Sequence, residues 1–374
     1  MSELRAGASK VDITPPVGTT MDGYSDRPEP STGIHDRLYC RALVLKTGQT
    51  KVALVSVDLC WLNRTVVLDV RKKATASGVD EVFLAATHTH SGPAVADFIV
   101  RPTTLGTDYI LSLPGLIAGA IEAASHRDRP ATIETSIGEA NLSINRRLRS
   151  LPVDPTVTSL NFRDNQGKPV AGVLNYSCHP TVLGPSNRQV SADYPGKVAE
   201  LVEAENGEGY VSLFLNGACG DVNPATCDGY RCDGSYDDVS RMAKRLMGAA
   251  KRAQGSKSPQ GKGIFSGATR IGPLPPWGLS FELTAMDLDG VALLGVPGEV
   301  FASTGAYLRR ALPSHLLVVS GFTNGYAGYF PTQDAFERKD YETRRICWVD
   351  ASAEAEIRAG ASSLLERVCK NGRP

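Results

Sequence analysis

The sequence predicts an α/β fold in which mixed parallel and antiparallel sheets are covered by helices and the functional site lies in loops at the strand ends. Short apolar runs with strand composition alternate with longer segments of helical periodicity. Residues 51–86 read as strand, helix and strand, an order that places two parallel strands in one sheet. Residues 264–296 instead contain apolar runs joined by short turns, which is typical of antiparallel strands.

The first expected elements are a strand, the segment 33–45 with a hairpin-like turn into a second strand, a helix and a further strand. The strand within 6–18 stops at two consecutive prolines, which cannot donate to a sheet ladder. The run 51–59 is apolar on both faces, as in a strand that is covered on both sides. Residues 63–77 have apolar positions at helical spacing and lead to the apolar run 82–86.

The middle of the chain continues this alternation. A helix is expected over 107–126, with Pro114 predicted to kink it or to break its first turns. The further strands expected in this part are 131–137, 156–162, 169–176 and 211–215. The further helices expected here are 195–205 and 237–253.

The C-terminal part is expected to contribute a second group of strands. Residues 264–271, 279–288 and 291–296 are predicted as antiparallel strands, and 316–320 as a final strand. Helices are predicted over 300–312 and 353–368. No repeat, low-complexity tract or linker divides the chain, so we expect a single domain over residues 1–374.

Composition narrows the classes of partner. The 374 residues carry 40 basic and 40 acidic side chains, so the formal net charge is zero. A chain of this charge has no electrostatic preference for binding nucleic acid or an anionic membrane. No apolar run reaches the length of a membrane span, and the N-terminus lacks the apolar segment of a signal peptide. We therefore expect a cytoplasmic protein with no stable membrane insertion and no nucleic-acid partner, acting on a small molecule.

The eight cysteines are too few for a disulfide scaffold in a chain of this length, and most lie in apolar runs, so reduced core thiols are expected. Cys227 and Cys232 are the exception, because they share one loop. Their spacing is wider than that of the usual two-residue zinc or redox pair. A local disulfide or an accidental pair is favoured over a metal knuckle.

Two histidines mark the first candidate site. The run 82–86 delivers His88 and His90 onto a Gly-Pro turn, and the whole chain has only six histidines. In extended backbone, residues two apart point to the same side, so both imidazoles could address one cavity. Neutral imidazole is a common ligand of transition metals. A pair of loop histidines that only form hydrogen bonds would show the same sequence pattern.

Other predicted strands also end in ligand-capable side chains. These are His179, Asp221, Glu299 and the pair Tyr326 and Tyr329. Loops at strand ends converge in helix-covered sheets, and two histidines with a carboxylate form a plausible site for a first-row metal, with zinc as the leading choice.

Five motifs, taken together and in order, resemble the catalytic N-terminal domain of the neutral/alkaline non-lysosomal ceramidase family. They are 87–93 (THTHSGP), 175–181 (NYSCHPT), 216–224 (NGACGDVNP), 296–299 (VPGE) and 324–329 (NGYAGY). The resemblance extends from VDITPP at 11–16 to the region of Tyr341. It covers the catalytic domain only, and we expect no counterpart of the additional C-terminal domain of that family.

The resemblance implies a catalytic zinc ion and a set of site residues. The metal ligands it implies are His88, His179, Glu299 and Tyr329. His90 is implied as a contact to the substrate or to the tetrahedral intermediate. Arg146 resembles an active-site arginine of the family, with Arg147 as the competing choice.

One position departs from the family pattern. Asn223 stands where ceramidases carry a serine, and an amide side chain cannot form an acyl-enzyme. We therefore expect zinc-activated water to attack a C–N amide bond, linear or cyclic, with Tyr329, Arg146 and Asn223 assisting and His90 protonating the leaving amine. Because the chain is expected to lack the additional C-terminal domain of the family and its sequence offers no obvious membrane-docking surface, ceramide itself is not the expected substrate.

Two alternatives use the same residues. A zinc-dependent esterase or lactonase would need the same activated water, because esters are easier to cleave than amides. A non-catalytic binding protein could keep the fold without the chemistry. The loops expected to shape the substrate pocket are 97–106, 226–236, 273–278 and 338–348.

Overall fold

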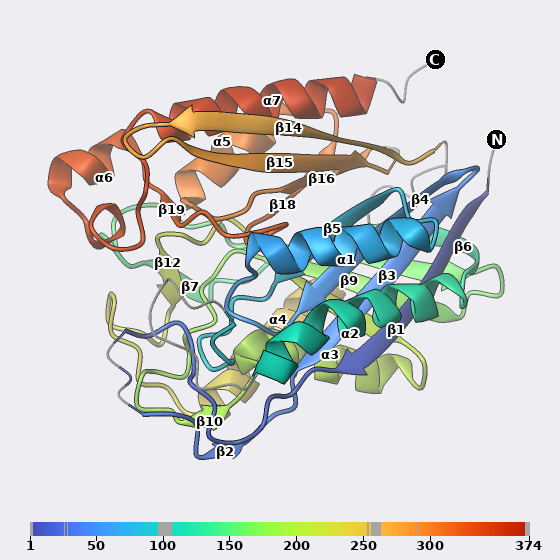
Figure 1. Ribbon diagram of the computed structural model, residues 1–374, viewed down its shortest axis with the longest axis horizontal. Coiled ribbons are helices and arrows are strands. Elements are labelled where there is room, and N and C mark those ends of the chain that lie inside the picture. The colour runs from blue at the N-terminus through green and yellow to red at the C-terminus, as the bar shows by residue number, and fades with distance from the viewer. Residues whose placement is uncertain are drawn as a thin grey trace.

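The computed structural model describes residues 3–25, 27, 29–95, 107–252, 254–255, 263–288 and 290–370 (Figure 1). Its main strands are β1 (Leu4–Asp12), β3 (Tyr39–Thr47), β4 (Thr50–Val57), β5 (Glu81–Ala86), β6 (Arg129–Glu139), β8 (Thr156–Asp164), β9 (Pro169–Tyr176), β11 (Val211–Asn216), β14 (Phe265–Leu274), β15 (Leu279–Asp287), β16 (Val291–Gly295) and β18 (Leu316–Ser320). Its helices are α1 (Arg64–Ala76), α2 (Thr107–Ser125), α3 (Asp193–Asn206), α4 (Tyr236–Arg252), α5 (Ala302–Ala311), α6 (Gln333–Arg338) and α7 (Ala353–Lys370), with a 3₁₀ turn, η1 (Tyr341–Thr343). The short strands are β2 (Gly33–Ile34), β7 (Ser143–Asn145), β10 (Gln189–Val190), β12 (Val222–Pro224), β13 (Gln254–Gly255), β17 (Glu299–Val300) and β19 (Tyr329–Phe330).

Two mixed sheets form the framework. The larger sheet has the order β11-β9-β8-β6-β1-β3-β4-β5, with β13 beside β6, and its terminal pairs β11–β9 and β4–β5 are parallel. The smaller sheet, β14-β15-β16-β18, is antiparallel except for the parallel pair β16–β18. This arrangement confirms the predicted mixed α/β fold, including the parallel strand-helix-strand unit and the antiparallel C-terminal strands.

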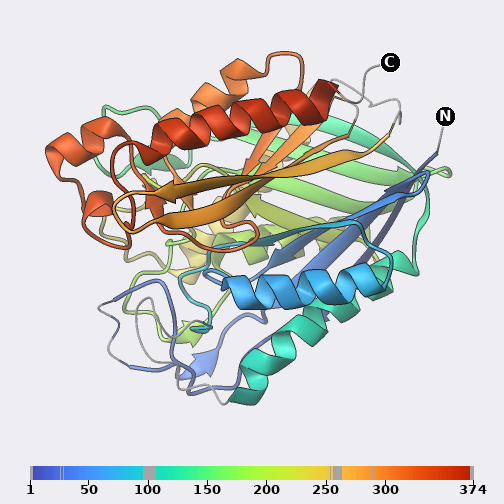
Figure 2. The same cartoon turned by 45° about the horizontal axis from the view of Figure 1, so that its top comes forward.

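Helices cover the sheets in layers. In Figure 1, α1 and α2 lie in front of the strands coloured blue, and α7 lies along β14 and β15 at the top of the molecule. Helices α3 and α4 pack on β11 and on β6 and β8, respectively. The view in Figure 2 shows the C-terminal sheet with α7 as a separate layer above the larger sheet. No helix of the described residues is both long enough and apolar enough to cross a membrane.

Alternation along β4 shows why the larger sheet is buried on both faces. Ala53 and Val55 pack in the core beneath the helices, whereas Val52 and Leu54 pack in a second core with residues of the smaller sheet. The prediction that this strand is covered on both sides is therefore confirmed. Ser56 in β4 also donates a hydrogen bond to the carbonyl of Phe214 in β11, so the sheet folds back on itself.

Buried asparagines join the two sheets near the site. Asn175 in β9 donates to the carbonyls of Leu215 in β11 and Val319 in β18. Asn324, after β18, exchanges hydrogen bonds with the backbone of Leu84 in β5. These contacts hold the C-terminal ends of strands from both sheets close together, which is where the loops with the candidate residues begin.

One predicted feature of a helix is wrong in part. Helix α2 begins at Thr107 and continues to Ser125 with Pro114 inside it, so the proline does not break its first turns. A proline removes one backbone donor and crowds the preceding turn. The rest of the helix is held by its buried face, which packs on β1 and β3.

Candidate active site

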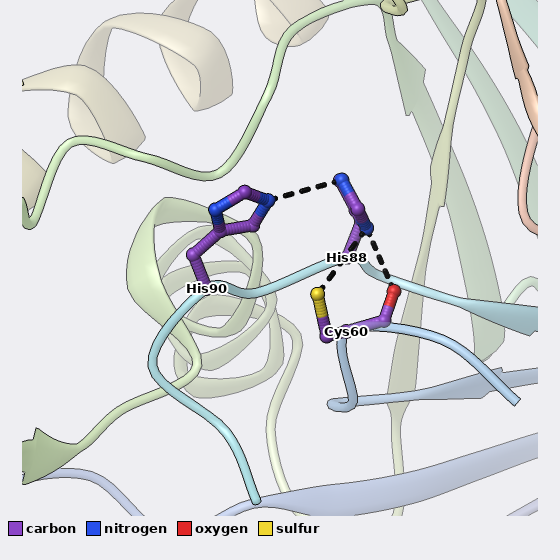
Figure 3. A group of neighbouring side chains, drawn as sticks. All are labelled: Cys60, His88 and His90. Atoms are coloured by element: carbon purple, nitrogen blue, oxygen red, sulfur yellow. Dashed lines mark hydrogen bonds between the residues drawn. The ribbon is translucent and has the colours of Figure 1, made fainter. Parts of the chain in front are cut away.

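His88 and His90 lie in the loop that follows β5 and line one pocket. Their Nε2 atoms are 3.1 Å apart (Figure 3). The shared cavity was expected from the sequence, but the extended backbone behind that expectation is wrong. His88 has a φ of 70°, so the chain turns at this residue instead of continuing the strand. Such strained backbone at a buried polar residue is typical of functional sites.

His179 and Glu299 reach the same place from two other strand ends. His179 follows β9, and Glu299 lies in β17. The predicted helix over 300–312 begins only at Ala302, because β17 intervenes. The Glu299 Oε2 atom is 2.9 Å from His179 Nε2 and 3.8 Å from His88 Nε2. All three side chains are buried.

Backbone carbonyls orient the two imidazole rings. His88 Nδ1 lies 2.7 Å from the carbonyl oxygen of Cys60. His179 Nδ1 lies 2.7 Å from the carbonyl of Cys219 and 3.0 Å from that of Val222. A carbonyl can only accept, so each Nδ1 carries the hydrogen and each Nε2 presents a lone pair.

Burial keeps both rings neutral. It lowers the pKa of His88 to about 3. It also lowers the pKa of His179 well below its ordinary value, and the positive charge of Arg146 acts in the same direction. Glu299 Oε2 has no hydrogen-bond partner in the described part of the chain. Three lone-pair donors thus face one point, an arrangement that a cation stabilises.

The spacing and chemistry of these donors fit a zinc ion. Tetrahedral zinc with bonds of about 2.0–2.1 Å places its nitrogen and oxygen ligands about 3.3 Å apart. The separations of 2.9 and 3.8 Å lie on either side of that value. Predicted ligands His88, His179 and Glu299 therefore form one group able to hold a metal ion.

Two tyrosines lie beside Glu299 and make different contacts. Tyr329 is the register partner of Glu299 in the parallel pair β17–β19 and lines the same pocket. Its hydroxyl oxygen accepts a hydrogen bond of 3.0 Å from Arg146. The Tyr326 hydroxyl instead donates to Glu299 Oε1 at 2.5 Å. The predicted role of Tyr329 as a metal ligand stays a prediction, and Tyr326 orients the carboxylate.

Arg146 is the arginine that faces the site. Its guanidinium lies 3.4 Å from His179 Nε2 and is buried against the carboxylate of Glu342 at 2.7 Å. Arg147 turns away. Its three carboxylate partners are Asp221, Asp334 and Asp340.

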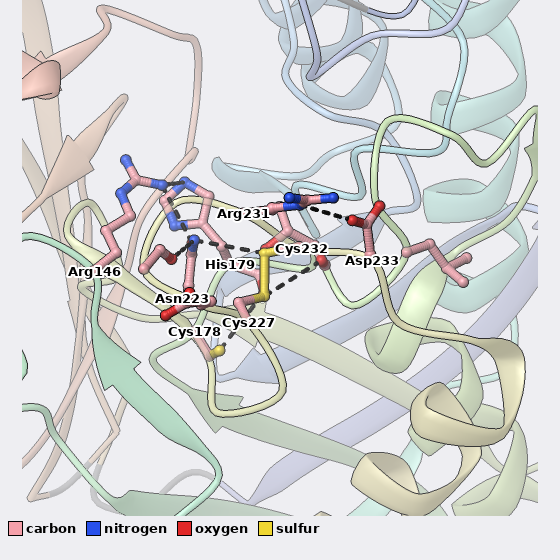
Figure 4. The surroundings of a disulfide bond; sticks show 12 residues. Arg146, Cys178, His179, Asn223, Cys227, Arg231, Cys232 and Asp233 are labelled. Atoms are coloured by element: carbon pink, nitrogen blue, oxygen red, sulfur yellow. Dashed lines mark hydrogen bonds and ion pairs between the residues drawn. A yellow bond between two sulfur atoms is a disulfide. The ribbon is translucent and has the colours of Figure 1, made fainter.

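Asn223 lies beside Arg146 on the pocket wall (Figure 4). Its Oδ1 accepts from Arg146 at 3.3 Å, and its Nδ2 donates to the carbonyl of Gly229 at 3.0 Å. The position expected from the sequence is thus in the site. The Asn223 Nδ2 also lies 3.6 Å from Cys232 Sγ, so three neighbours hold the amide in place.

The pocket in front of His88, His179 and Glu299 has a volume of about 640 Å³. Two of the loops expected to shape it contribute side chains: 226–236 with Tyr230 and Arg231, and 338–348 with Tyr341 and Ile346. The loop 273–278 does not line it, so that expectation is wrong. The expected loop 97–106 lies outside the described residues.

Cys227 and Cys232 form a disulfide bond (Figure 4). The metal-knuckle alternative is therefore wrong and the local disulfide is confirmed. Cys232 lines the pocket, so the disulfide closes the short loop that presents Tyr230 and Arg231.

Sequence reasoning missed several contributors. Glu342, which neutralises buried Arg146, carried no motif signal. The NGYAGY motif marks Tyr326 as ligand-capable, but nothing in the sequence indicates that its hydroxyl donates to Glu299. Asp221 was counted among ligand-capable residues, yet it accepts hydrogen bonds from Asn145 and the backbone of Ala302 and has a structural role.

The fold and the site together define a class: an α/β protein with a buried group of side chains able to hold a metal ion at its strand ends. The chain belongs to the neutral/alkaline non-lysosomal ceramidase family, whose N-terminal domain profile matches residues 4–273. His88, Arg146, His179 and Asn223 lie within that match. Glu299 lies beyond it, so its place in the site rests on the geometry.

Comparison with characterised proteins agrees with this family. The neutral ceramidase of Pseudomonas aeruginosa is 23% identical over 97% of this chain and 72% of its own length. Neutral ceramidase A of Dictyostelium discoideum is 28% identical over 62% of this chain, a match that spans only 38% of that relative.

The fold agrees with solved structures. A crystal structure of the neutral ceramidase from Pseudomonas aeruginosa superposes with a TM-score of 0.84 at 22% identity, covering 98% of this chain and 75% of that one. A structure described as a ceramidase complexed with C2 gives the same TM-score, 0.84, at 21% identity.

Proposed function

We propose that this chain is a zinc-dependent hydrolase that cleaves the C–N amide bond of a small N-acyl molecule with water as the nucleophile. The observation that supports this most directly is the buried Glu299 Oε2 facing the lone pairs of His88 and His179. These three residues would hold the zinc ion, and the chemistry it would supply is that of a Lewis acid that activates water and polarises a carbonyl group. The relatives are named ceramidases, so they give no support to the expectation of a different substrate, and ceramide is the first compound to test.

The protein's own groups account for the remaining steps. Arg146 donates hydrogen bonds to Tyr329 and Asn223 in the wall of the pocket. Its buried positive charge would stabilise the negative charge that develops on the oxygen of a substrate carbonyl group bound there. His90 Nδ1 has no hydrogen-bond partner in the described chain, and burial lowers the pKa of its ring well below the ordinary value. A neutral imidazole can take up a proton and return it to the leaving amine.

The central experiment measures metal content and activity together. His88→Ala and His179→Ala should each lose the zinc of this site and the hydrolysis of a short-chain ceramide. His126→Ala, an exposed histidine at the C-terminal end of α2, is the matched control and should keep both. Full activity in demonstrably metal-free protein contradicts the proposal.

The substrate screen separates the alternatives. Ceramides, other N-acyl amides, lactams, esters and lactones should be compared by kcat/KM on the zinc-loaded protein. Faster turnover of esters or lactones favours the esterase. A folded, zinc-loaded protein that is inactive on all of them favours the binding protein.

The water mechanism has its own test. Because Asn223 cannot be acylated, mass spectrometry of the protein quenched during turnover should show only its unmodified mass. A covalent acyl adduct on any residue contradicts attack by water.

A cytoplasmic location stays a prediction. The Cys227–Cys232 disulfide is more typical of an oxidising compartment. Fractionation of source cells followed by immunodetection of the chain decides between the two.

A further inference from the structure

Three ligand-capable side chains come together far from the candidate active site. They are Asp287 at the end of β15, His315 just before β18 and Cys369 in the last turn of α7. One ligand atom from each lies within 4.8 Å of the other two. The three residues are separated by 28 and 54 positions in the sequence, so tertiary structure alone unites them.

Topology explains both the convergence and the distance from the active site. Strands β16 and β18 are parallel. Asp287 and His315 lie at the N-terminal end of this pair, whereas Glu299 and Tyr326 follow its C-terminal end. Five strand residues separate the two ends by about 16 Å. Helix α7 lies along β14 and β15 (Figure 2), and Cys369 in its last turn lies close to Asp287 and His315 at the N-terminal end of the parallel pair.

The Asp287 and His315 side chains are 5% and 6% exposed, and His315 Nε2 lies 3.6 Å from Asp287 Oδ1. That distance is too long for a hydrogen bond. It is close to the spacing of about 3.3 Å between nitrogen and oxygen ligands on one tetrahedral zinc ion. Cys369 is buried beside them.

Ser314 contacts the ring nitrogen of His315 that does not face Asp287. Its Oγ lies 2.9 Å from His315 Nδ1. With the Nδ1 hydrogen donated to Oγ, the lone pair on Nε2 points toward Asp287. A hydroxyl can also donate to Nδ1, so binding of a metal ion by Nε2 would select the tautomer in which Nδ1 donates to Ser314; a hydrogen bond at the second ring nitrogen usually accompanies a metal-ligating histidine.

We propose that Asp287, His315 and Cys369 bind a second zinc ion. A thiolate and an imidazole favour zinc over magnesium or calcium, and three protein ligands leave one position for water. The ion would fasten the C-terminal end of α7 to the start of the parallel pair β16–β18. This site is independent of the proposed hydrolase activity.

Metal stoichiometry tests the proposal. Purified protein saturated with zinc and then desalted should hold two ions per chain. Cys369→Ala and Asp287→Asn should each hold one ion and retain hydrolytic activity. His179→Ala should also hold one ion, and the double variant that combines Cys369→Ala with His179→Ala should hold none. Cys347→Ala, a half-buried cysteine outside the cluster, is the matched control and should hold two. Two ions in Cys369→Ala overturn the proposal.

The same experiment separates this site from the active site. If the active site binds no zinc, wild-type protein should hold one ion that Cys369→Ala removes and His179→Ala does not. A single ion removed by His179→Ala but retained in Cys369→Ala would overturn the second site and leave the hydrolase proposal intact.

Cobalt substitution tests the second site with Cys369 in place, so it does not depend on whether Cys369→Ala or Asp287→Asn folds. Cobalt bound by a thiolate absorbs in the near ultraviolet through charge transfer. Cys60→Ala removes the thiol near His88, so in that background the band should persist and should report Cys369 alone. Its absence from folded, cobalt-loaded Cys60→Ala protein overturns the assignment.

Discussion

The two oxygens of Glu299 in the candidate site have different surroundings. Oε2 faces the imidazoles, whereas Oε1 accepts a hydrogen bond from the Tyr326 hydroxyl. The tyrosine therefore fixes the direction of the carboxylate without contacting the substrate pocket itself.

Tyr326→Phe should weaken zinc binding. Losing an outer partner of a metal ligand typically costs about 10–100-fold in metal affinity, so the dissociation constant of the active-site zinc should rise by that factor. Competition against a chelator of known affinity measures it. Tyr109→Phe, which loses a hydrogen bond to the carbonyl of Ile13 away from the site, should leave the affinity unchanged, and equal effects of the two variants would contradict the positioning role.

Gly23→Ala should lower kcat by displacing His90. A Cβ at Gly23 would lie 2.4 Å from His90 Cγ, and the residue has a φ of 97°. Gly18 has a similar φ of 91° with nothing within 4 Å of its Cβ position, so Gly18→Ala imposes similar backbone strain without the clash. Steady-state kinetics should show a loss for Gly23→Ala alone. Similar losses in both would mean that strain, rather than the position of His90, limits turnover.

At the scale of elements, the start of α3 contains a buried charge. The Asp193 carboxylate accepts hydrogen bonds from the backbone of Leu183 and Tyr194. Burial nevertheless raises its pKa from 3.8 to about 7. It lies outside the pocket lining, so this carboxylate anchors the helix to a loop instead of acting on substrate.

Stability should therefore depend on pH through Asp193. Its pKa is higher in the folded state than in the unfolded state, so its contribution is fully present below about pH 4 and is lost as the pH rises through about 7. Asp193→Asn should make the free energy of unfolding fall less steeply across this interval. Urea unfolding at several pH values measures the slope. Asp69→Asn on the exposed face of α1 is the control, and an unchanged slope in Asp193→Asn would contradict the prediction.

For the whole molecule, the predicted metal ligands connect the two sheets. His88 and His179 follow strands of the larger sheet, whereas Glu299 follows β16 of the smaller one. An ion held by all three would therefore oppose separation of the sheets as well as serve the chemistry.

Zinc should stabilise the metal-free protein. Ligand that binds only the folded state adds about 2.7 kcal/mol at 100 times its dissociation constant. The midpoint of thermal unfolding should rise with zinc concentration and should rise less in His179→Ala. An equal rise in the two proteins would show that zinc acts elsewhere.

Much of the fold could be predicted from local patterns. Apolar runs of strand length and helical periodicity identified α1, α3, α4, α7 and the main strands to within a few residues. The short strands β17 and β19 could not be identified, because two-residue ladders leave no periodic pattern. Helix α2 continued through Pro114 because tertiary packing outweighed a local preference.

The sequence named the residues of the candidate site but could not give their geometry. Motifs named His88, His179 and Glu299, because these chemical types recur in fixed local contexts. They could not distinguish Arg146 from Arg147, since neighbouring residues differ only in the direction they face. They also missed Glu342, whose role is set by a partner almost two hundred positions away.

The sequence by itself determined the mixed α/β class, the family resemblance and the chemical types at the site, because these depend on residue identity and short-range periodicity. Only the tertiary structure decided which lone pairs converge, which arginine is buried among them, and that Cys369 meets His315 and Asp287. Those relations depend on how distant strand ends and a C-terminal helix pack, and no local pattern records that packing.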